Sequence, residues 1–297
     1  MRGAAIVMVA CAACASDLEK QSEVVKLRVL AVRADPAEIV ISDGGLPPRT
    51  TFTALAVEPS GAATSMRYAL CTDQDPAPSP SLDCPGSQGV DLPPAGATSA
   101  VLDLTDPRYL PVLSASGDGG TPDAGGILHD GVAVLIGFEA SAPAQTGPDG
   151  GPPGADGGPL QIVRGYTTIV LHDDTRPANR NPDLAAVRIG PDGGVDLALD
   201  GSTTVPANTT QRLTPVPAPD AKEPTPAGPE KLGYSFFATA GSISSLRSID
   251  TTATGEAADT FVDWATPGTP GPVRIWVVVR DGRGGTGWLE RGVSVVR

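Results

Sequence analysis

The chain has 297 residues, including 36 Gly and 31 Pro, and its formal charge at pH 7 is −13. Only 4% of the residues are aromatic, and no apolar run approaches the ~18 residues that a membrane-spanning helix needs. This composition excludes a coiled coil, a long helical bundle and a polytopic membrane protein, while 40% hydrophobic content argues against a fully disordered chain. The acidic balance argues against nucleic acid as a partner.

The first predicted element is a signal sequence at residues 1–13. Arg2 precedes a short apolar run that ends in small residues, which is typical of a secretory signal. The segment resembles a bacterial lipoprotein signal, in which a small residue precedes the cysteine that becomes lipidated. Cys14 and Cys11 both follow an Ala and are the two candidates. An ordinary cleaved signal with no lipid is the alternative.

The cysteine count favours Cys14 as the lipid anchor. Lipidation there leaves Cys71 and Cys84 as a pair, whereas lipidation of the earlier cysteine leaves an odd thiol in an oxidising compartment. Asp does not follow Cys14 directly, which in the lipoprotein pattern indicates the outer membrane. We expect the polar residues 14–23 to form a tether between the lipid and the first domain.

Fourteen segments are predicted to be β-strands, because β-branched and aromatic residues alternate with polar ones between turn signals. Seven lie in each half of the chain, and seven is the strand number of an immunoglobulin-like sandwich. We therefore expect an all-β protein with two tandem immunoglobulin-like antiparallel β-sandwiches after a lipoprotein signal peptide. The predicted strands are 25–33, 38–41, 51–57, 66–71, 99–104, 132–140, 161–171, 184–189, 195–199, 209–215, 232–238, 260–264, 273–280 and 287–296.

A polar stretch at 173–183 separates the two predicted domains, which span 24–172 and 184–297. It has no apolar period, and its two Pro residues would stiffen it as a linker. The two halves end on similar strands, Arg-Gly-Tyr-Thr-Thr-Ile from position 164 and Arg-Gly-Val-Ser-Val-Val from position 291. This likeness indicates an internal repeat, with chance similarity between β-rich strands as the alternative.

Three stretches resemble tandem immunoglobulin-like surface lipoproteins of Gram-negative bacteria. They are Leu-Arg-Val-Leu-Ala-Val-Arg-Ala-Asp-Pro at 27–36, Asn-Arg-Asn-Pro at 179–182 and Val-Val-Val-Arg-Asp-Gly-Arg-Gly-Gly at 277–285. The resemblance extends over most of the chain after the signal and implies a lipid-anchored envelope protein. It implies no particular activity, because the sandwich fold serves adhesins, receptors, enzyme spacers and structural modules.

Cys71 and Cys84 are predicted to form a disulfide, which is the simplest pairing in an exported chain. The bond would close a short loop at the end of a strand and contribute ~3 kcal/mol in the chain-entropy model. The spacing is too short for the disulfide that joins the two sheets of antibody domains. A catalytic or metal role is disfavoured, since there is no CxxC motif and no nearby His.

The linker also contains oxygen ligands that suit calcium, and it is faintly similar to the calcium-binding junctions of cadherins. The candidates are Asp173, Asp174, Asn179, Asn181 and Asp183. Arg residues interrupt the stretch, and the acidic clusters that cadherin loops add are not evident. Calcium is therefore the one cofactor considered, and a solvated hinge without metal is the alternative.

Trp276 is the candidate for stacking against a sugar ring. In the predicted strand 273–280 the odd-numbered positions up to 279 are Val or Ile and share one face, whereas Trp276 lies on the other face between Arg274 and Arg280. That placement predicts an exposed aromatic platform. Packing of the indole within a core or between sheets is the alternative reading.

No catalytic constellation is evident. The two histidines, His129 and His172, lie at the ends of different predicted strands, and neither GxSxG nor HExxH occurs. We expect a non-catalytic, lipid-anchored protein of the outer membrane that acts as a binding, adhesion or scaffold subunit, with a carbohydrate-binding module as the alternative. Its expected partners are the membrane, through the N-terminal lipid, and an envelope protein or glycan. The loops 141–160 and 114–130 are the first surfaces to probe.

Overall fold

The computed structural model describes residues 21–42, 48–71, 84, 89–109, 131–143, 160–191, 194–225, 228–251 and 255–297. Within these residues the regular structure is β-strand throughout, and none of them forms a helix that could traverse a bilayer. The predicted signal at 1–13, both candidate anchors, the loop 114–130 and positions 144–159 of the other loop lie outside the described residues.

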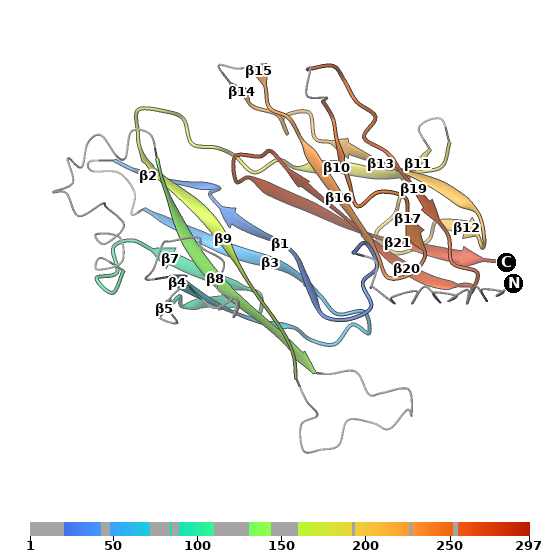
Figure 1. Cartoon of the computed structure of the whole chain (residues 1–297), viewed down its shortest axis with the longest axis horizontal. Helices are drawn as coiled ribbons and strands as arrows, with labels where there is room; N and C mark the ends of the chain where they lie inside the picture. Colours follow the sequence, from blue (N-terminus) through green and yellow to red (C-terminus); the bar gives the residue numbers. More distant parts are fainter. Residues whose placement is uncertain are drawn as a thin grey trace, which may run out of the picture.

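The first sandwich consists of two facing sheets (Figure 1). One has the strand order β1-β3-β7-β6, and the other has the order β2-β9-β8-β4-β5. The strands are β1 (Arg28–Asp35), β2 (Glu38–Ile41), β3 (Arg49–Val57), β4 (Ser65–Cys71), β5 (Gly89–Asp91), β6 (Pro94–Gly96), β7 (Ser99–Asp103), β8 (Val132–Pro143) and β9 (Leu160–Asp173).

The second sandwich repeats this plan. Its sheets have the orders β11-β10-β13-β19-β17 and β12-β21-β20-β16-β18, and a small hairpin, β14-β15, is added. The strands are β10 (Leu184–Ile189), β11 (Val195–Asp196), β12 (Thr204–Pro206), β13 (Thr210–Pro217), β14 (Pro224–Thr225), β15 (Gly228–Pro229), β16 (Gly233–Ala238), β17 (Ser242–Ile243), β18 (Arg247–Ile249), β19 (Val262–Ala265), β20 (Gly271–Arg280) and β21 (Thr286–Val296).

The strand order identifies both halves as immunoglobulin-like. In that fold one sheet contains strands A, B, E and D, and the other contains C, F and G. β1-β3-β7-β6 and β10-β13-β19-β17 follow the first order, while β9-β8-β4 and β21-β20-β16 follow the second. In each half an edge strand, β2 or β12, also runs parallel to the last strand. The predicted all-β fold is confirmed, and the two halves share one topology.

Each sandwich has its own apolar core between its sheets. In the first, the rings of Phe52 and Tyr68 stack with centroids 6.1 Å apart, and the Tyr68 hydroxyl donates to the carbonyl of Thr98 at 2.9 Å. In the second, Trp264 is fully buried, and its Nε1 donates to the carbonyl of Ala240 at 3.1 Å. The buried polar atoms of these rings thus have partners, as a dry core requires.

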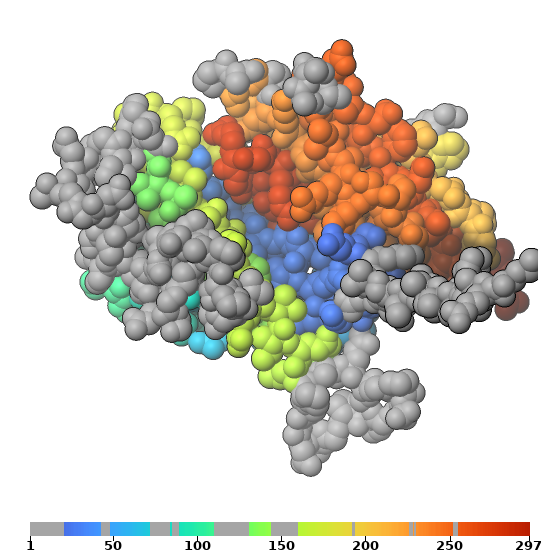
Figure 2. Space-filling view, viewed as in Figure 1, coloured from blue at the N-terminus to red at the C-terminus, as the bar shows by residue number. Residues whose placement is uncertain are grey.

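A third apolar core lies between the two sandwiches. It joins the outward side of β1 and β3 to the outward side of β16, β20 and β21 (Figure 1). Figure 2 shows the first described residues, which include β1 and are coloured blue, lying against the second sandwich, coloured orange and red. We call this contact the interdomain core. It contains Val24, Leu30, Ala31, Leu55, Val57, Trp276 and Val278, with Phe237 and Trp288 packed against it.

The prediction that Trp276 is an exposed sugar platform is wrong, because its side chain is 0% exposed within the interdomain core. The predicted alternation along β20 is nevertheless correct. The flanking arginines cross to the first sandwich, where Arg274 donates to the carbonyls of Glu58 and Pro59 at 2.9 Å and Arg280 donates to that of Leu30 at 3.0 Å. The outward face of β20 was therefore assigned to Trp276 correctly, but the first sandwich covers that face.

The end of the predicted tether is bound to the second sandwich. Glu23 forms a parallel bridge with Ala238 at the end of β16. The amide of Val24 donates to the carbonyl of Ala238 at 2.8 Å, and the amide of Ala238 donates to the carbonyl of Ser22 at 2.9 Å. The chain therefore contacts the second sandwich before it enters β1 of the first.

Candidate functional site

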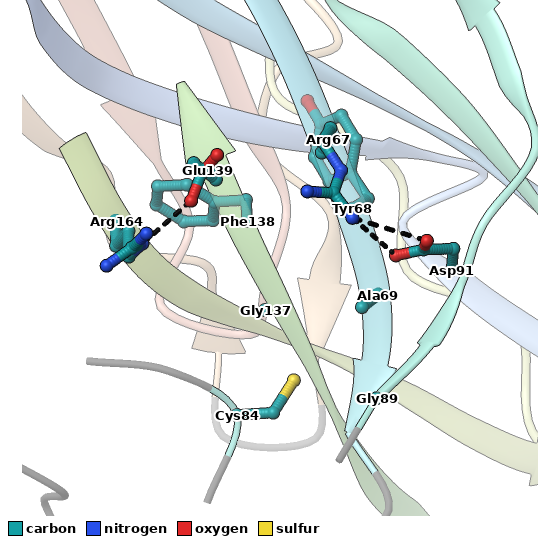
Figure 3. Close-up of a pocket in the computed structure, with 10 residues that line it drawn as sticks. All are labelled: Arg67, Tyr68, Ala69, Cys84, Gly89, Asp91, Gly137, Phe138, Glu139 and Arg164. Atoms are coloured by element: carbon teal, nitrogen blue, oxygen red, sulfur yellow. Dashed lines mark hydrogen bonds and ion pairs between the residues drawn. The ribbon is translucent and has the colours of Figure 1, made fainter. Parts of the chain in front are cut away.

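The outward side of the β2-β9-β8-β4-β5 sheet carries a depression of about 370 Å³, which we call the first-sandwich depression (Figure 3). The equivalent side of the second sandwich is the one buried in the interdomain core. The two repeats thus differ in what their corresponding faces contact. The lining residues are Arg67, Tyr68, Ala69, Cys84, Gly89, Asp91, Gly137, Phe138, Glu139 and Arg164.

Small residues and the predicted disulfide shape the floor. Cys71 and Cys84 are bonded, with their Cα atoms 5.1 Å apart, which confirms that prediction. A Cβ at Gly137 would lie 2.7 Å from the Sγ of Cys84, and one at Gly89 would lie 3.2 Å from it. Glycine is therefore needed at position 137 for the disulfide to lie against the sheet. The bond keeps Cys84 next to the depression.

Four charged side chains from four neighbouring strands form the rim. Arg67 on β4 contacts Asp91 on β5 at 3.3 Å, and Arg164 on β9 contacts Glu139 on β8 at 2.7 Å. Arg67, Glu139 and Arg164 are also directly opposite one another in the strand register, so their side chains share one face. Following the sheet from β5 to β9, the charges alternate in sign (Figure 3).

Aromatic and apolar side chains continue the surface along β9. Tyr166 is 48% exposed and is the cross-strand partner of Gly137, so the two residues share one face of the sheet, and Tyr166 also borders a neighbouring depression beside β1 and Arg280. Phe138, on β8, packs against the core of the first sandwich and covers Gly165 on that inner side, where a Cβ would lie 2.6 Å from the Phe138 ring. Ile162 is a further exposed apolar residue on this strand. The face therefore combines hydrogen-bonding groups with a partly exposed ring.

The lining residues provide hydrogen-bond donors and acceptors but no pairing of a nucleophile with a base. The charged groups are two guanidinium and two carboxylate groups in ion pairs, and Tyr68 has its pKa raised by burial. Among the described residues, no group of three or more His, Cys, Asp or Glu side chains could hold a metal ion.

The linker brings together buried polar groups from both sandwiches. Glu38 is buried, accepts from the amide of Asn179 at 2.7 Å, and lies 3.3 Å from both Arg176 and His172. The side chain of Asn179 donates to Asp281 of the second sandwich at 2.8 Å. Asn179 thus connects a carboxylate of the first sandwich to one of the second.

Asn181 forms a second bridge. Its Nδ2 donates to the carbonyl of Ala34 at 2.7 Å, and its Oδ1 accepts from the amide of Thr286 at 2.9 Å. Gly287 completes the fit, because a Cβ there would overlap the carbonyl oxygen of Pro182. The linker is therefore docked against both sandwiches and is not a solvated hinge.

The five calcium candidates do not converge on one point. Asn179 and Asn181 bridge the sandwiches as described, Asp183 contacts Arg33 at 3.5 Å, and the Oδ1 of Asp173 accepts from the amide of Thr175 at 3.1 Å. Asp174 is exposed. The structure thus gives these side chains separate partners and does not assemble them as a cation site.

Sequence reasoning missed the rim of the depression. Arg67, Glu139 and Arg164 each occupy a polar position in a predicted strand, so their outward direction was available from the alternation. What brings them into one row is the register between β4, β8 and β9, which alternation within single strands does not provide. The short strand β5, which supplies Asp91, was not predicted.

No protein-family model matches the chain, and no curated protein sequence matches it. Among solved structures it is similar to the D00-D0 domain of intimin, with 9% identity over 90% of this chain and 100% of that one and a TM-score of 0.26. It is also similar to SGBP-B of a Bacteroides ovatus mixed-linkage glucan utilization locus, solved with a mixed-linkage heptasaccharide. That match has 10% identity over 92% of this chain and 48% of that one, with a TM-score of 0.21.

A third similar structure is a nucleoside hydrolase-related protein from Saccharophagus degradans, with 18% identity over 40% of this chain and a TM-score of 0.24. The chain spans 26% of the length of that protein, and about half the length of the Bacteroides protein. At TM-scores this low, the likenesses carry no argument about function. The immunoglobulin-like assignment rests on the strand order.

Proposed function

We propose that the protein is a non-catalytic binding subunit of the cell envelope that presents the outer face of its first sandwich to a partner. The observation that carries this proposal is the fixed arrangement of the two sandwiches. Domains joined by a single linker usually move relative to one another unless their interface is large and apolar. Here the interdomain core, with Trp276 fully buried, and the two bridging asparagines oppose such motion.

A fixed arrangement suits a protein that presents a binding face. Because the two sandwiches are held together, the first-sandwich depression keeps one orientation relative to the rest of the molecule. Its floor is supported by the disulfide, and its rim residues are paired to one another before any ligand arrives. A prearranged site loses less entropy on binding. The absence of a nucleophile–base pair among its lining residues supports binding without catalysis.

We further propose that lipid at Cys14 anchors the protein to the outer membrane. Residues 22–24 contact β16, and the chain from Cys14 to Gln21, with six residues between them, reaches at most about 25 Å when extended. On this proposal the contact between the two sandwiches lies near the anchor, because the carbonyl of Gln21 also accepts from Arg28 of β1 at 2.7 Å.

The anchor is tested by fractionating cells that express the full chain. Cys14→Ser should release the protein from the outer-membrane fraction, and Cys11→Ser, the matched control, should leave it there. Release by Cys11→Ser alone would move the anchor to that residue. If the wild-type chain and both variants are all found in the soluble fraction, lipid anchoring is overturned.

The binding role is tested by cross-linking in intact envelopes with a diazirine reagent, which inserts into protein and glycan alike, followed by mass spectrometry of the attached molecules. The double variant Arg67→Gln/Glu139→Gln should lose the adducts that the wild-type chain forms. The control is Arg188→Gln/Asp196→Asn, which removes an exposed ion pair of the second sandwich. Equal adducts from all three chains would overturn the proposal, and so would turnover of a captured molecule.

A further inference from the structure

We infer that the ligand of the first-sandwich depression is a neutral oligosaccharide. This inference rests on the binding function proposed above and names its ligand class. A volume of about 370 Å³ lies in the range of small-ligand sites, ~300–1,000 Å³. The depression is thus of a size for a few sugar rings, and it is lined by polar groups at its rim and by small residues at its floor.

The charge balance of the rim selects against an ionic ligand. Among the described lining residues, Arg67 and Arg164 contribute two positive charges, while Asp91 and Glu139 contribute two negative charges, so these four groups sum to zero. An anionic ligand would have to separate each arginine from its carboxylate and then lie beside that carboxylate. Repulsion between like charges opposes this. A cationic ligand meets the same difficulty with the signs reversed.

Paired guanidinium and carboxylate groups are suited to hydroxyl groups. A hydroxyl donates one hydrogen bond and accepts others, whereas a guanidinium only donates and a carboxylate only accepts. Neighbouring hydroxyls of a sugar can therefore accept from Arg67 and donate to Asp91, and the next pair can do the same at Arg164 and Glu139. Hydrogen bonds to charged groups are the stronger kind. The row of rim charges across β5, β4, β8 and β9 gives such contacts a direction.

The exposed ring of Tyr166 supplies the apolar contact that a sugar also needs. A pyranose ring has C–H faces as well as hydroxyl edges, and an aromatic ring can cover the former while polar groups bind the latter. Tyr166 lies beside Gly137 across the strands, next to the row of charges. Its 48% exposure leaves ring surface available for stacking against a sugar. Trp276 cannot stack in this way, because its side chain is fully buried.

The test is a binding assay of the full chain, purified in detergent, against defined oligosaccharides. The panel pairs neutral β-glucan, mannan and xylan hexasaccharides with anionic oligogalacturonates and sulfated saccharides. We expect binding to at least one neutral member and none to the anionic ones. Tyr166→Ala and Glu139→Gln should each weaken that binding about tenfold or more, ~1.4 kcal/mol. Arg188→Gln on the second sandwich is the matched control and should leave it unchanged.

Other outcomes are informative. If the melting temperatures of Tyr166→Ala and Glu139→Gln are unchanged, a weaker affinity reflects lost contacts with the sugar. Arg67→Gln is a third variant that should fold, because the Arg67 side chain is 71% exposed. Preference for an anionic saccharide, or neutral binding that all three variants retain, would overturn the inference. If no saccharide binds but the rim variants still lose their cross-linked protein adducts, the binding function stands and the sugar assignment falls.

Discussion

At the scale of single residues, glycines decide where the disulfide can lie. Gly137 faces both sulfurs: a Cβ built there would be 2.7 Å from the Sγ of Cys84 and 3.4 Å from that of Cys71. The contact with Cys84 is shorter than the distance that real Cβ atoms keep, so one of the two partners must shift. The strand that carries Gly137 is inside its sheet, and its other face packs on the core, so Cys84 is the partner that would have to shift.

Gly137→Ala should therefore lower the free energy of unfolding by roughly 1–3 kcal/mol, as overpacked sites do. The measurement is urea unfolding in a double-mutant cycle with Cys71→Ala/Cys84→Ala. Once the sulfur atoms are gone, the added methyl group has room, and Gly137→Ala should cost much less. An equal cost in both backgrounds would show that the disulfide is not what the methyl group meets.

At the scale of secondary-structure elements, alternation along the chain predicted the long strands well. Every predicted strand corresponds to an observed one, and the two ranges 38–41 and 184–189 agree at both ends. The strands that were missed, such as β5, β12 and β17, have two or three residues and are too short to display a period of two. They are found only through their partners, because pairing across strands defines them.

The burial of outward faces could not be predicted from alternation. The pattern along β20 correctly places Trp276 opposite the core of its own sandwich. It does not reveal that β1 and β3 of the other sandwich cover that face. For the same reason, the asparagines at 179 and 181 were noted as oxygen donors, while their bridging role depends on Ala34, Asp281 and Thr286, which are distant in sequence.

The turn between β20 and β21 carries a carboxylate whose pKa is set by this packing. Burial raises the pKa of Asp281 above its ordinary value, although Asn179 and the amides of Arg283 and Gly285 donate to it. Nearby Glu230 also raises it. A carboxyl group whose pKa is higher in the folded state binds its proton more tightly there. Its stabilising contribution is present below the unfolded pKa of ~3.9 and is lost as the pH rises through the folded pKa.

Asp281→Asn should remove this pH dependence. The new side-chain amide keeps an oxygen that accepts from the two backbone amides. The Oδ1 of Asn179 has no partner in the structure. After the Asn179 amide rotates, this oxygen can accept from the Nδ2 of the new asparagine. Urea unfolding at pH values from about 4 to 8 should show the variant gaining stability relative to the wild-type chain as the pH rises. Asp281→Ala, which leaves the donors unpaired, should be less stable by about 1–3 kcal/mol throughout. An Asn variant that loses stability relative to the wild-type chain towards pH 8 would show that the ionised carboxylate is the stabilising form.

At the scale of the whole molecule, the interdomain core makes one unit of two sandwiches that each have a core of their own. Tandem sandwiches joined by a free linker would unfold separately and scatter X-rays as a flexible pair. Here the N-terminal residues before β1, the outward face of β20 and the linker all contribute to a shared contact (Figure 2). We therefore expect the wild-type chain to unfold in a single calorimetric transition.

Trp276 and Trp264 allow this expectation to be tested with matched substitutions, because both side chains are fully buried but in different cores. Either Trp→Ala change should cost about 3–5 kcal/mol through the cavity it leaves. Trp276→Ala removes contacts between the sandwiches, so it should split the calorimetric transition in two and increase the maximum dimension in solution X-ray scattering. Trp264→Ala weakens the second sandwich internally and should lower the transition without lengthening the folded molecule. If Trp276→Ala keeps one transition and an unchanged scattering profile, the linker bridges alone hold the two sandwiches, and the interdomain core is not what couples them.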